Sequence, residues 1–395
     1  MNKKIAIVTD GVWRKSLSVI RALGKDKYFI YVMGDSWLTT GFWSKYTSMR
    51  IKCKTAEEDE NAFGEKIFNL IFDLNKKNIK PIIFPMEDAT IKWLSKNEDK
   101  LKDSAYFLIP DKKSLEIAGD KNKTMLFAKK LKIPHPRTWF FTSKKELIEI
   151  IKTLKDNYEY VIKPIESQGS RGIIYTNKKK LLEFNPFPYL REYKSALIQE
   201  RISEEGEAIG VSILMDEKNE CRAFFVHKRL QQYPNTGGPS TDRISIENKN
   251  LVDLSIRLLR SLNWKGVVMV EWKVDPKDKI PKLLEINPRF WGSLELAVRS
   301  GVNFPILYAK AAKNEEFSNI FNYKLGVRCR WLIPGEILRF LTQKKEKRES
   351  LLTFLKGLPY QAEEWDLKDL PGFIATIVCQ FLLVLNPKYW KYLKR

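Results

Sequence analysis

The first hundred residues alternate between short apolar runs and longer stretches in which apolar residues return every three or four positions. The run "KIAIVTD" (4–10) is typical of a buried strand, and the stretch after it places Leu17, Ile20 and Leu23 on one side of a helix. Further elements follow in the same alternation: strands at 28–34, 81–85 and 106–110, and a helix over 57–77. This order predicts a parallel α/β unit. Its first turn, Asp10-Gly11, lacks G-x-G-x-x-G, so we interpret the unit as a scaffold that also lines a substrate cleft.

The middle of the chain changes to a pattern dominated by strands. A helix beginning at Asp120 ends in a turn marked by Pro134 and Pro136, and a second helix is predicted over 143–155. A series of strands follows, interrupted by one helix over 249–262: 160–165, 196–202, 208–215, 221–230, 266–274 and 282–288. Short connections between successive strands favour antiparallel pairing. We therefore predict an α/β unit over 1–115, a small antiparallel unit over 116–205 and a larger one over 206–312.

Residues 313–395 differ in character from the rest and are predicted to form a mostly helical extension. A charged connector (343–350) precedes "GFIATIVCQFLLVL" (372–385), which is followed by the basic and aromatic "NPKYWKYLKR" (386–395). The apolar stretch is shorter than the roughly 18–20 residues of a membrane span. Two interpretations stay open: a buried helix of a C-terminal unit, or a segment in peripheral contact with an anionic membrane surface.

Composition and charge narrow the class of protein. The 70 Lys and Arg against 48 Asp and Glu give a net charge of +22, which favours anionic partners, although lysine-covered solvated helices would give the same value. The absence of a helix-turn-helix, zinc-finger or RNP motif means that nucleic acid is not favoured as a partner. Four scattered cysteines without a CxxC pair argue against a zinc site or a disulfide framework. With no signal peptide apparent, we expect a cytoplasmic protein, with a peripheral location at the inner face of the membrane as the alternative.

The strongest candidate chemistry lies in the last two predicted strands. Alternation places Glu271 on one face of "GVVMVEWKV" and Glu285 and Asn287 on one face of "KLLEINP". If the strands form a hairpin, two carboxylates face each other, which is unfavourable unless a cation lies between them. Carboxylate and amide oxygens suit Mg²⁺, and Arg289 can bind a phosphoryl or carboxylate oxygen in bidentate fashion. The alternative is a solvated strand edge, which is harder to reconcile with the Glu285-Asn287-Pro288-Arg289 string.

Two further stretches are weak evidence for a nucleotide-binding site when each is taken alone. "KPIESQGSRGI" (163–173) is a glycine-containing turn whose backbone N–H groups could converge on an anion. "ALIQERISEEGEAIG" (196–210) ends a strand at a polar linker, where an exposed backbone edge could read adenine.

Taken in order, these stretches resemble the ATP-grasp superfamily, in particular the carboxylate–amine ligase branch related to biotin carboxylase and the large subunit of carbamoyl-phosphate synthetase. The resemblance runs from "GDKNKTMLFAKKLKIPHP" to "LLEINPRFWGS", over roughly residues 119–312. It implies an N-terminal pre-ATP-grasp domain, then a two-subdomain ATP-grasp fold with antiparallel sheets.

The resemblance also implies roles for individual residues. ATP would be bound by Lys121, Lys163, Gly169, Ser170, Gly172, Glu200, Ile202 and Glu207. Of these, Lys163 would contact the α/β-phosphates, Glu200 and Ile202 would read adenine, and Glu207 would bind ribose. Two Mg²⁺ ions, for which Mn²⁺ can substitute, would be held by Glu271, Glu285 and Asn287. Arg289 would stabilise the transferred phosphoryl group.

The implied reaction is the activation of a carboxylate as an acyl-phosphate, followed by attack of an amine that gives an amide, ADP and phosphate. Three alternatives are kept: a biotin-dependent-type carboxylase, for which no A-M-K-M carrier segment is present, a basic nucleic-acid-binding protein, and a nucleotide-binding protein without turnover. The substrates would be a small carboxylate and an amine, and the setting would be cell-envelope or peptide-like metabolite synthesis. A homodimer is the assembly considered.

The stretch "FFVHKRLQQYPNTGGPSTDRISI" (224–246) is the candidate substrate site. It groups His227 and Arg229 with Gly237 and Gly238, donors and glycines that suit capture of a carboxylate, although a hydrated loop would look the same. Arg299 could add a second clamp, although a surface arginine is the simpler interpretation. Some relatives, D-aspartate ligase among them, join amino acids to cell-wall precursors, and a membrane-facing extension would fit that setting.

Overall fold

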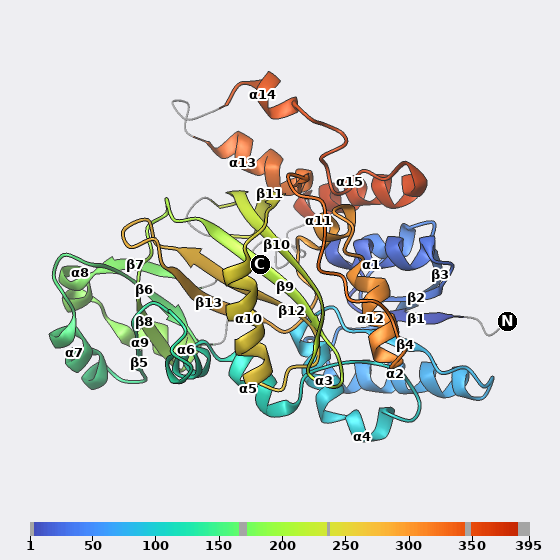
Figure 1. Cartoon of the computed structure of the whole chain (residues 1–395), viewed down its shortest axis with the longest axis horizontal. Helices are drawn as coiled ribbons and strands as arrows, with labels where there is room; N and C mark the ends of the chain where they lie inside the picture. The colour runs from blue at the N-terminus through green and yellow to red at the C-terminus, as the bar shows by residue number, and fades with distance from the viewer. Residues whose placement is uncertain (1–3, 166–171, 235–237, 344–348, 386–395) are drawn as a thin grey trace.

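The computed structural model describes residues 4–165, 172–234, 238–343 and 349–385, and these residues contain three β-sheets (Figure 1). The parallel N-terminal sheet, the two antiparallel sheets and the helical C-terminal part confirm the predicted fold class. Gly169, Ser170 and Gly237 lie outside the described residues.

The first unit is built on a parallel sheet with strand order β3-β2-β1-β4. Its strands are β1 (Ile5–Val8), β2 (Phe29–Gly34), β3 (Thr47–Lys52) and β4 (Ile82–Phe84). Its helices are α1 (Arg14–Lys25), η1 (Thr40–Trp43), α2 (Glu60–Asn75), α3 (Asp88–Lys96), α4 (Glu98–Leu101) and α5 (Lys112–Gly119). Because the chain leaves β1 toward β2 on one side and returns to β4 on the other, a crevice is expected beyond the carboxyl ends of β1 and β4.

The strand predicted at 106–110 is wrong in extent, because the structure forms only an isolated bridge there, between Tyr106 and Ile82. Beyond the bridge, the N–H of Leu108 donates instead to the hydroxyl of Tyr308, at 3.1 Å. A side chain from a distant helix therefore satisfies a backbone group that a strand partner would have used.

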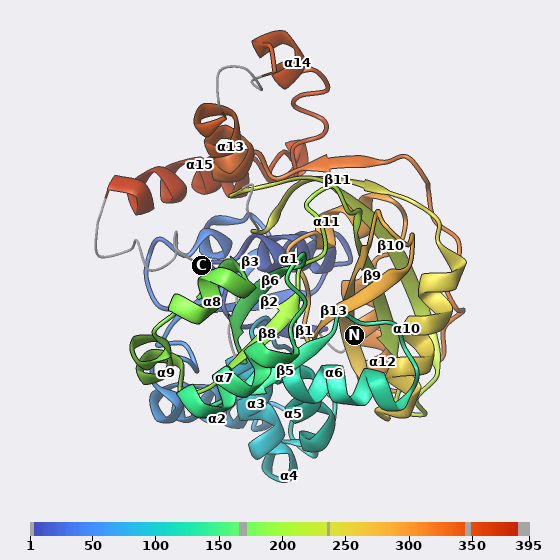
Figure 2. The same cartoon turned by 90° about the vertical axis from the view of Figure 1, so that its left-hand side faces the viewer.

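The second unit carries the small sheet, with order β5-β8-β6-β7 and every neighbouring pair antiparallel. Its strands are β5 (Thr138–Phe141), β6 (Glu159–Pro164), β7 (Ile174–Asn177) and β8 (Ala196–Glu200). Its helices are α6 (Lys121–Lys130), α7 (Lys144–Thr153), α8 (Lys178–Glu183) and α9 (Pro186–Tyr193). The small sheet has a hydrophobic cluster of its own, which includes Phe141, Tyr160 and Ile198. Figure 2 shows this unit facing the viewer.

The large sheet has six strands in the order β13-β12-β9-β10-β11-β14, all antiparallel. Its strands are β9 (Ala208–Met215), β10 (Cys221–Gln232), β11 (Ser240–Ser245), β12 (Gly266–Val274), β13 (Pro281–Asn287) and β14 (Arg328–Arg330). The helices packed with it are α10 (Lys249–Ser261), α11 (Leu294–Arg299) and α12 (Phe304–Ala312).

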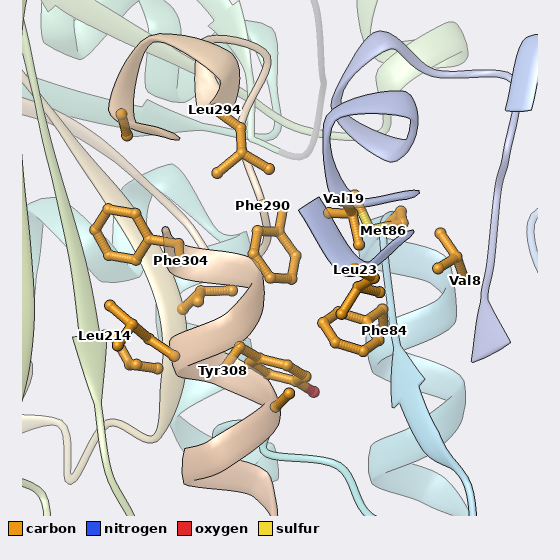
Figure 3. Close-up of a cluster of buried hydrophobic side chains, with 14 of the residues drawn as sticks. Val8, Val19, Leu23, Phe84, Met86, Leu214, Phe290, Leu294, Phe304 and Tyr308 are labelled. Atoms are coloured by element: carbon orange, nitrogen blue, oxygen red, sulfur yellow. The ribbon is translucent and has the colours of Figure 1, made fainter. Parts of the chain in front are cut away.

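The large sheet and the parallel sheet share one hydrophobic core. Figure 3 shows Phe84 of β4 close to Phe290 and Tyr308, with Leu214 of β9 on the far side of α12. The Phe84 and Tyr308 rings lie 5.0 Å apart, and the Tyr308 hydroxyl donates to the carbonyl of Ile83 at 3.2 Å. The first unit is therefore packed firmly onto the large sheet, which fixes the carboxyl ends of β1 and β4 beside the segment that follows β13.

The C-terminal part continues from β14 into helices at one end of the molecule (Figures 1 and 2). They are η2 (Leu332–Glu336), α13 (Ile337–Thr342), α14 (Leu351–Leu355), η4 (Leu367–Asp369) and α15 (Leu370–Leu385). Among the described residues, no helix has both the length and the apolar character needed to cross a membrane.

Candidate active site

The centre of the site is the antiparallel pair β12 and β13, in which Glu271 lies opposite Glu285 and Met269 opposite Asn287. The Asn287 side-chain amide donates to Oε1 of Glu271 and to Oε1 of Glu285, each at 3.3 Å. The three residues that were predicted as metal ligands therefore lie together on one face of the large sheet. We call Glu271 and Glu285 the acid pair.

The pKa values of the two carboxyl groups in the acid pair are shifted in opposite directions. Burial raises the pKa of Glu271 above its ordinary value, and Glu285 raises it further, although an ion pair with Arg229 opposes the shift. Burial acts on Glu285 too, but the Lys121 ammonium and the Arg229 guanidinium outweigh it and lower the pKa of Glu285. A bound cation would favour ionisation of both groups, because opposite charge within a few ångströms stabilises a carboxylate.

The donor set fits Mg²⁺ in its chemistry. Two carboxylates and an amide are hard oxygen donors, and Mg²⁺ usually completes its shell with phosphate and water oxygens. Within the described parts of the chain, no group of three or more His, Cys, Asp or Glu side chains could hold a metal ion. A cation at the acid pair would therefore depend on oxygens from a bound phosphate and from water.

Two lysines of the second unit lie near the acid pair, one on the small sheet and one at the start of a helix. Lys163 on β6 donates to Oε1 of Gln199 at 2.8 Å, and burial lowers its pKa to about 8 while Glu285 opposes the shift. Lys121 begins α6, and its Nζ lies 3.5 Å from the carbonyl oxygen of Ile165. Both ammonium groups lie near enough to Glu285 to lower the pKa of its carboxyl group. The structure thus places positive charge on one side of the site and the acid pair on the other.

The segment between the two antiparallel sheets carries the residues predicted to bind the nucleoside. Glu200 is the last residue of β8, and its carboxylate accepts a hydrogen bond from the backbone N–H of Arg137 at 3.3 Å. Ile202 is buried, and its carbonyl oxygen lies 3.5 Å from Nζ of Lys273. Glu207, just before β9, pairs with Lys228. These residues follow one another along the edge where the sheets meet, and their contact with a nucleotide stays a prediction.

Two of the predicted glycines lie within the described residues, and both are confined. Gly172 has a φ of +69°, and a Cβ there would lie 2.7 Å from Cγ of Pro164. Its carbonyl accepts from the Tyr189 hydroxyl at 2.6 Å. A Cβ on Gly238 would lie 2.2 Å from the carbonyl oxygen of Tyr233. A side chain at either position would force the surrounding backbone to move.

Arg289 faces the first unit. Its Nε lies 3.0 Å from Oδ1 of Asp88 and 4.0 Å from Oε2 of Glu87, at the start of α3. The same Glu87 pairs at 2.8 Å with Nζ of Lys15 on α1, which also donates to the carbonyl of Phe290 at 3.3 Å. We call Lys15, Glu87, Asp88 and Arg289 the junction cluster. Burial lowers the pKa of Lys15 to about 8, and the nearby Arg289 adds to this effect.

The residues of the junction cluster that come from the first unit were missed by the sequence analysis. They are Lys15, Glu87 and Asp88. The nearby Asp10, which the sequence analysis named only as part of the first turn, is buried, and burial together with Glu87 raises its pKa to about 6. The only signal was general: the turn after the first strand of a parallel sheet lies where such sheets bind ligands.

The predicted substrate residues divide into two groups. Arg229 joins the site through its ion pair with Glu271. His227 does not: it is 1% exposed, Ser293 Oγ lies 3.2 Å from its Nε2, and its ring fills the space that Gly210 leaves open. Arg299 donates to the carbonyls of Tyr360 and Ala362, at 2.8 and 2.9 Å. It therefore holds the C-terminal segment rather than lining the site.

Comparisons with known proteins relate part of this chain to ATP-grasp proteins. A family model described as "ATP-grasp in the biosynthetic pathway with Ter operon" matches residues 197–333. The N5-carboxyaminoimidazole ribonucleotide synthase of Saccharolobus solfataricus is 24% identical over 220 residues, 54% of this chain and 57% of that protein. The carbamoyl phosphate synthase large chain of Methanobrevibacter smithii is 22% identical over 214 residues, 52% of this chain and 20% of that protein.

Among solved structures, the biotin carboxylase domain of the Hydrogenobacter thermophilus 2-oxoglutarate carboxylase, a dimer in complex with MgADP, ADP and bicarbonate, superposes with a TM-score of 0.66. It is 14% identical, and the match covers 82% of this chain and 73% of that one, which establishes similarity of fold alone. The chain spans little more than half of one curated relative and a fifth of the other.

Proposed function

We propose that this chain is a member of the ATP-grasp superfamily and an ATP- and Mg²⁺-dependent ligase that activates a carboxylate and couples it to an amine. The observation that carries the proposal is the acid pair with Asn287 on adjacent strands, near Lys121 of α6 and Lys163 of β6 in the second unit. Such a pair reduces stability on its own, and a divalent cation bound with a polyphosphate removes the repulsion.

Different residues would bind the metal ion, the phosphates and the nucleoside. Glu271, Glu285 and Asn287 would hold Mg²⁺, which would neutralise charge on the phosphate oxygens. Lys121 and Lys163 would contact the phosphates, while Glu200, Ile202 and Glu207 line the edge where the nucleoside would bind. The depressed pKa of Lys163 reflects burial without enough negative charge nearby, and bound phosphate would supply that charge.

The acid substrate would bind between the acid pair and the junction cluster. This position lies beyond the carboxyl ends of β1 and β4, where parallel sheets commonly bind ligands. Arg289 follows directly after Asn287 and Pro288, so one short segment would connect the cation site with the substrate site. Its guanidinium group can bind a carboxylate in bidentate fashion after exchanging its present partner Asp88.

The proposed reaction has two steps. A carboxylate oxygen attacks the γ-phosphorus of ATP, the bond from that phosphorus to the bridging oxygen breaks, and ADP leaves. The nitrogen of an amine then attacks the acyl carbon, phosphate leaves with the electrons of the C–O bond, and the nitrogen loses a proton. Exclusion of water protects the intermediate from hydrolysis, which is a function that closure of the small sheet over the large one would serve.

The test is release of ADP from MgATP with a panel of amino acids, small carboxylic acids and bicarbonate, with hydroxylamine added to trap an activated carboxylate. We expect one acid to stimulate ADP release and to form a hydroxamate. If bicarbonate alone stimulates ADP release and no hydroxamate forms, the chain is closer to the carboxylase alternative. Stimulation by no acid, with MgATP bound, would favour a nucleotide-binding protein without turnover and contradict the proposal.

A further inference from the structure

The apolar helix α15 is anchored on one face and bare on the other. Its exposed apolar residues recur at helical spacing, each with 40–62% of its surface accessible: Leu370, Ile374, Ile377, Val378, Phe381, Leu382 and Leu385. Between them, Ala375, Thr376 and Cys379 are buried against the rest of the molecule. A continuous apolar stripe exposed along a helix indicates a binding face. Apolar residues that are exposed by chance are scattered singly over a surface, whereas contiguous ones mark an interaction site.

Neighbouring helices add to the bare surface at the same end of the molecule (Figures 1 and 2). On α13, Leu341 is 60% exposed, and on α14, Leu351 and Leu352 are 59% and 83% exposed. Two tryptophans, Trp37 and Trp43, are 55% and 39% exposed beside η1, the short helix against which α15 packs. We call the exposed stripe of α15 together with these five residues the apolar face.

The apolar face is mounted on a fixed platform. Residues 360–369, which precede α15, are held by the buried Arg21 of α1 and the half-buried Arg299 of α11. Arg21 donates to Oδ2 of Asp369 at 2.8 Å and to the carbonyl of Glu364 at 3.0 Å. Asp369 also accepts from the backbone N–H of Lys45 at 2.8 Å. The bare face of α15 is therefore presented at a defined orientation.

Charge distinguishes between the possible occupants. A second copy of this chain would bring +22 against +22, whereas an anionic lipid surface attracts that charge. The sequence directly after α15 continues with four cations, Lys388, Lys391, Lys394 and Arg395, interleaved with Tyr389, Trp390 and Tyr392. Apolar residues beside lysine, tyrosine and tryptophan are the composition of segments that lie in a membrane interface.

We propose that the apolar face docks the protein on an anionic phospholipid bilayer, with α15 lying in the interface. This inference goes beyond the proposed function and does not depend on it. The first test is co-sedimentation of the full chain with vesicles of phosphatidylcholine alone or mixed with phosphatidylglycerol. We expect binding to the mixed vesicles, weaker binding to the neutral ones, and partial loss of binding as salt is raised.

The second test compares two double variants. Ile374→Ser with Phe381→Ser removes two exposed side chains from the stripe, and we expect it to weaken vesicle binding by about tenfold or more. Leu182→Ser with Phe187→Ser removes two side chains of similar exposure, 70% and 63%, from α8 and α9, and should bind vesicles as the wild type does. ADP release by both variants should equal that of the wild type, which separates this test from that of the ligase.

Three results would overturn the proposal. One is failure of the wild type to bind mixed vesicles. Another is equal binding by both double variants. The third is light scattering that shows a dimer which Ile374→Ser with Phe381→Ser dissociates, since the occupant would then be a second copy.

Discussion

The acid pair and the carboxylate of Asp369 are both buried, but their surroundings satisfy them in different ways. Asp369 accepts from Arg21, from the hydroxyl of Ser44 at 2.9 Å and from two backbone N–H groups, of Lys45 and Gly372. Glu271 and Glu285 instead face each other across two strands and share the amide donor of Asn287, while Arg229 forms an ion pair with Glu271. The Asp369 carboxylate thus accepts from four donor groups, whereas the carboxylates of Glu271 and Glu285 share the amide of Asn287.

The difference shows which buried charges serve stability and which serve binding. Around Asp369, the arginine, hydroxyl and amide donors offset the cost of burial and connect the C-terminal segment to α1 and η1. At the acid pair the raised pKa of Glu271 shows that its charge is disfavoured in the absence of a ligand. A group that lowers stability while remaining buried is a candidate for function.

The largest expected effect is that of Glu271→Gln. Gln keeps the shape and an acceptor for Arg229 but removes one negative charge, so ADP release should fall about 10²–10³-fold, as it does when a group that stabilises transition-state charge is lost. The free energy of unfolding should be unchanged or higher, because the charge of Glu271 is disfavoured in the folded state. Glu217→Gln, which alters an exposed carboxylate paired with Lys265, is the control and should leave ADP release unchanged. Wild-type ADP release by Glu271→Gln would remove the acid pair from the mechanism.

The next effect is on stability alone. Arg21→Ala removes one charged donor from the buried carboxylate of Asp369 and a donor from each of the backbone carbonyls of Glu363 and Glu364, so the free energy of unfolding in urea should fall by about 3–5 kcal/mol. Lys25→Ala, on the same helix, removes a half-exposed partner of Asp366, and its effect should stay below about 1 kcal/mol. Equal losses of unfolding free energy in the two variants would show that burial does not make the Arg21–Asp369 ion pair more stabilising than the Lys25–Asp366 ion pair.

The smallest effect concerns His227, which lies near both Arg229 and Arg243. Burial and these two guanidinium groups lower its pKa to about 3, so it stays neutral in the folded protein while the unfolded chain takes up a proton near pH 6.5. The folded protein therefore loses stability through His227 as pH falls below 6.5, and this loss stops near pH 3.

Asp10 acts in the opposite direction over part of that range. Its pKa of about 6 means that the folded state gains a proton first, which favours folding as pH falls. The measurement is therefore the difference between the wild type and His227→Gln in urea unfolding at a series of pH values. A pH dependence identical in the two proteins would show that His227 is not buried as a neutral group.

Much of the site could be predicted from local sequence. Alternation in "GVVMVEWKV" and "KLLEINP" predicted which side chains share a face, and the short connection between them predicted the hairpin. The register that places Glu271 opposite Glu285 follows from that hairpin, and the structure shows it. The partners of Arg289 could not be predicted in this way, because Glu87 and Asp88 lie some two hundred residues earlier in the chain and follow an ordinary short strand.

The sequence by itself determined most of the helices and strands, and the two acids and the amide that gather on one hairpin. These properties depend on periodicity and on neighbours in the chain, which a single sequence displays. Tertiary structure alone decided that Arg289 meets the first unit, that Arg299 holds the C-terminal segment, and that His227 is enclosed. Those outcomes depend on packing between residues that are distant in the chain, because burial and the choice of partner are set only when separate elements meet.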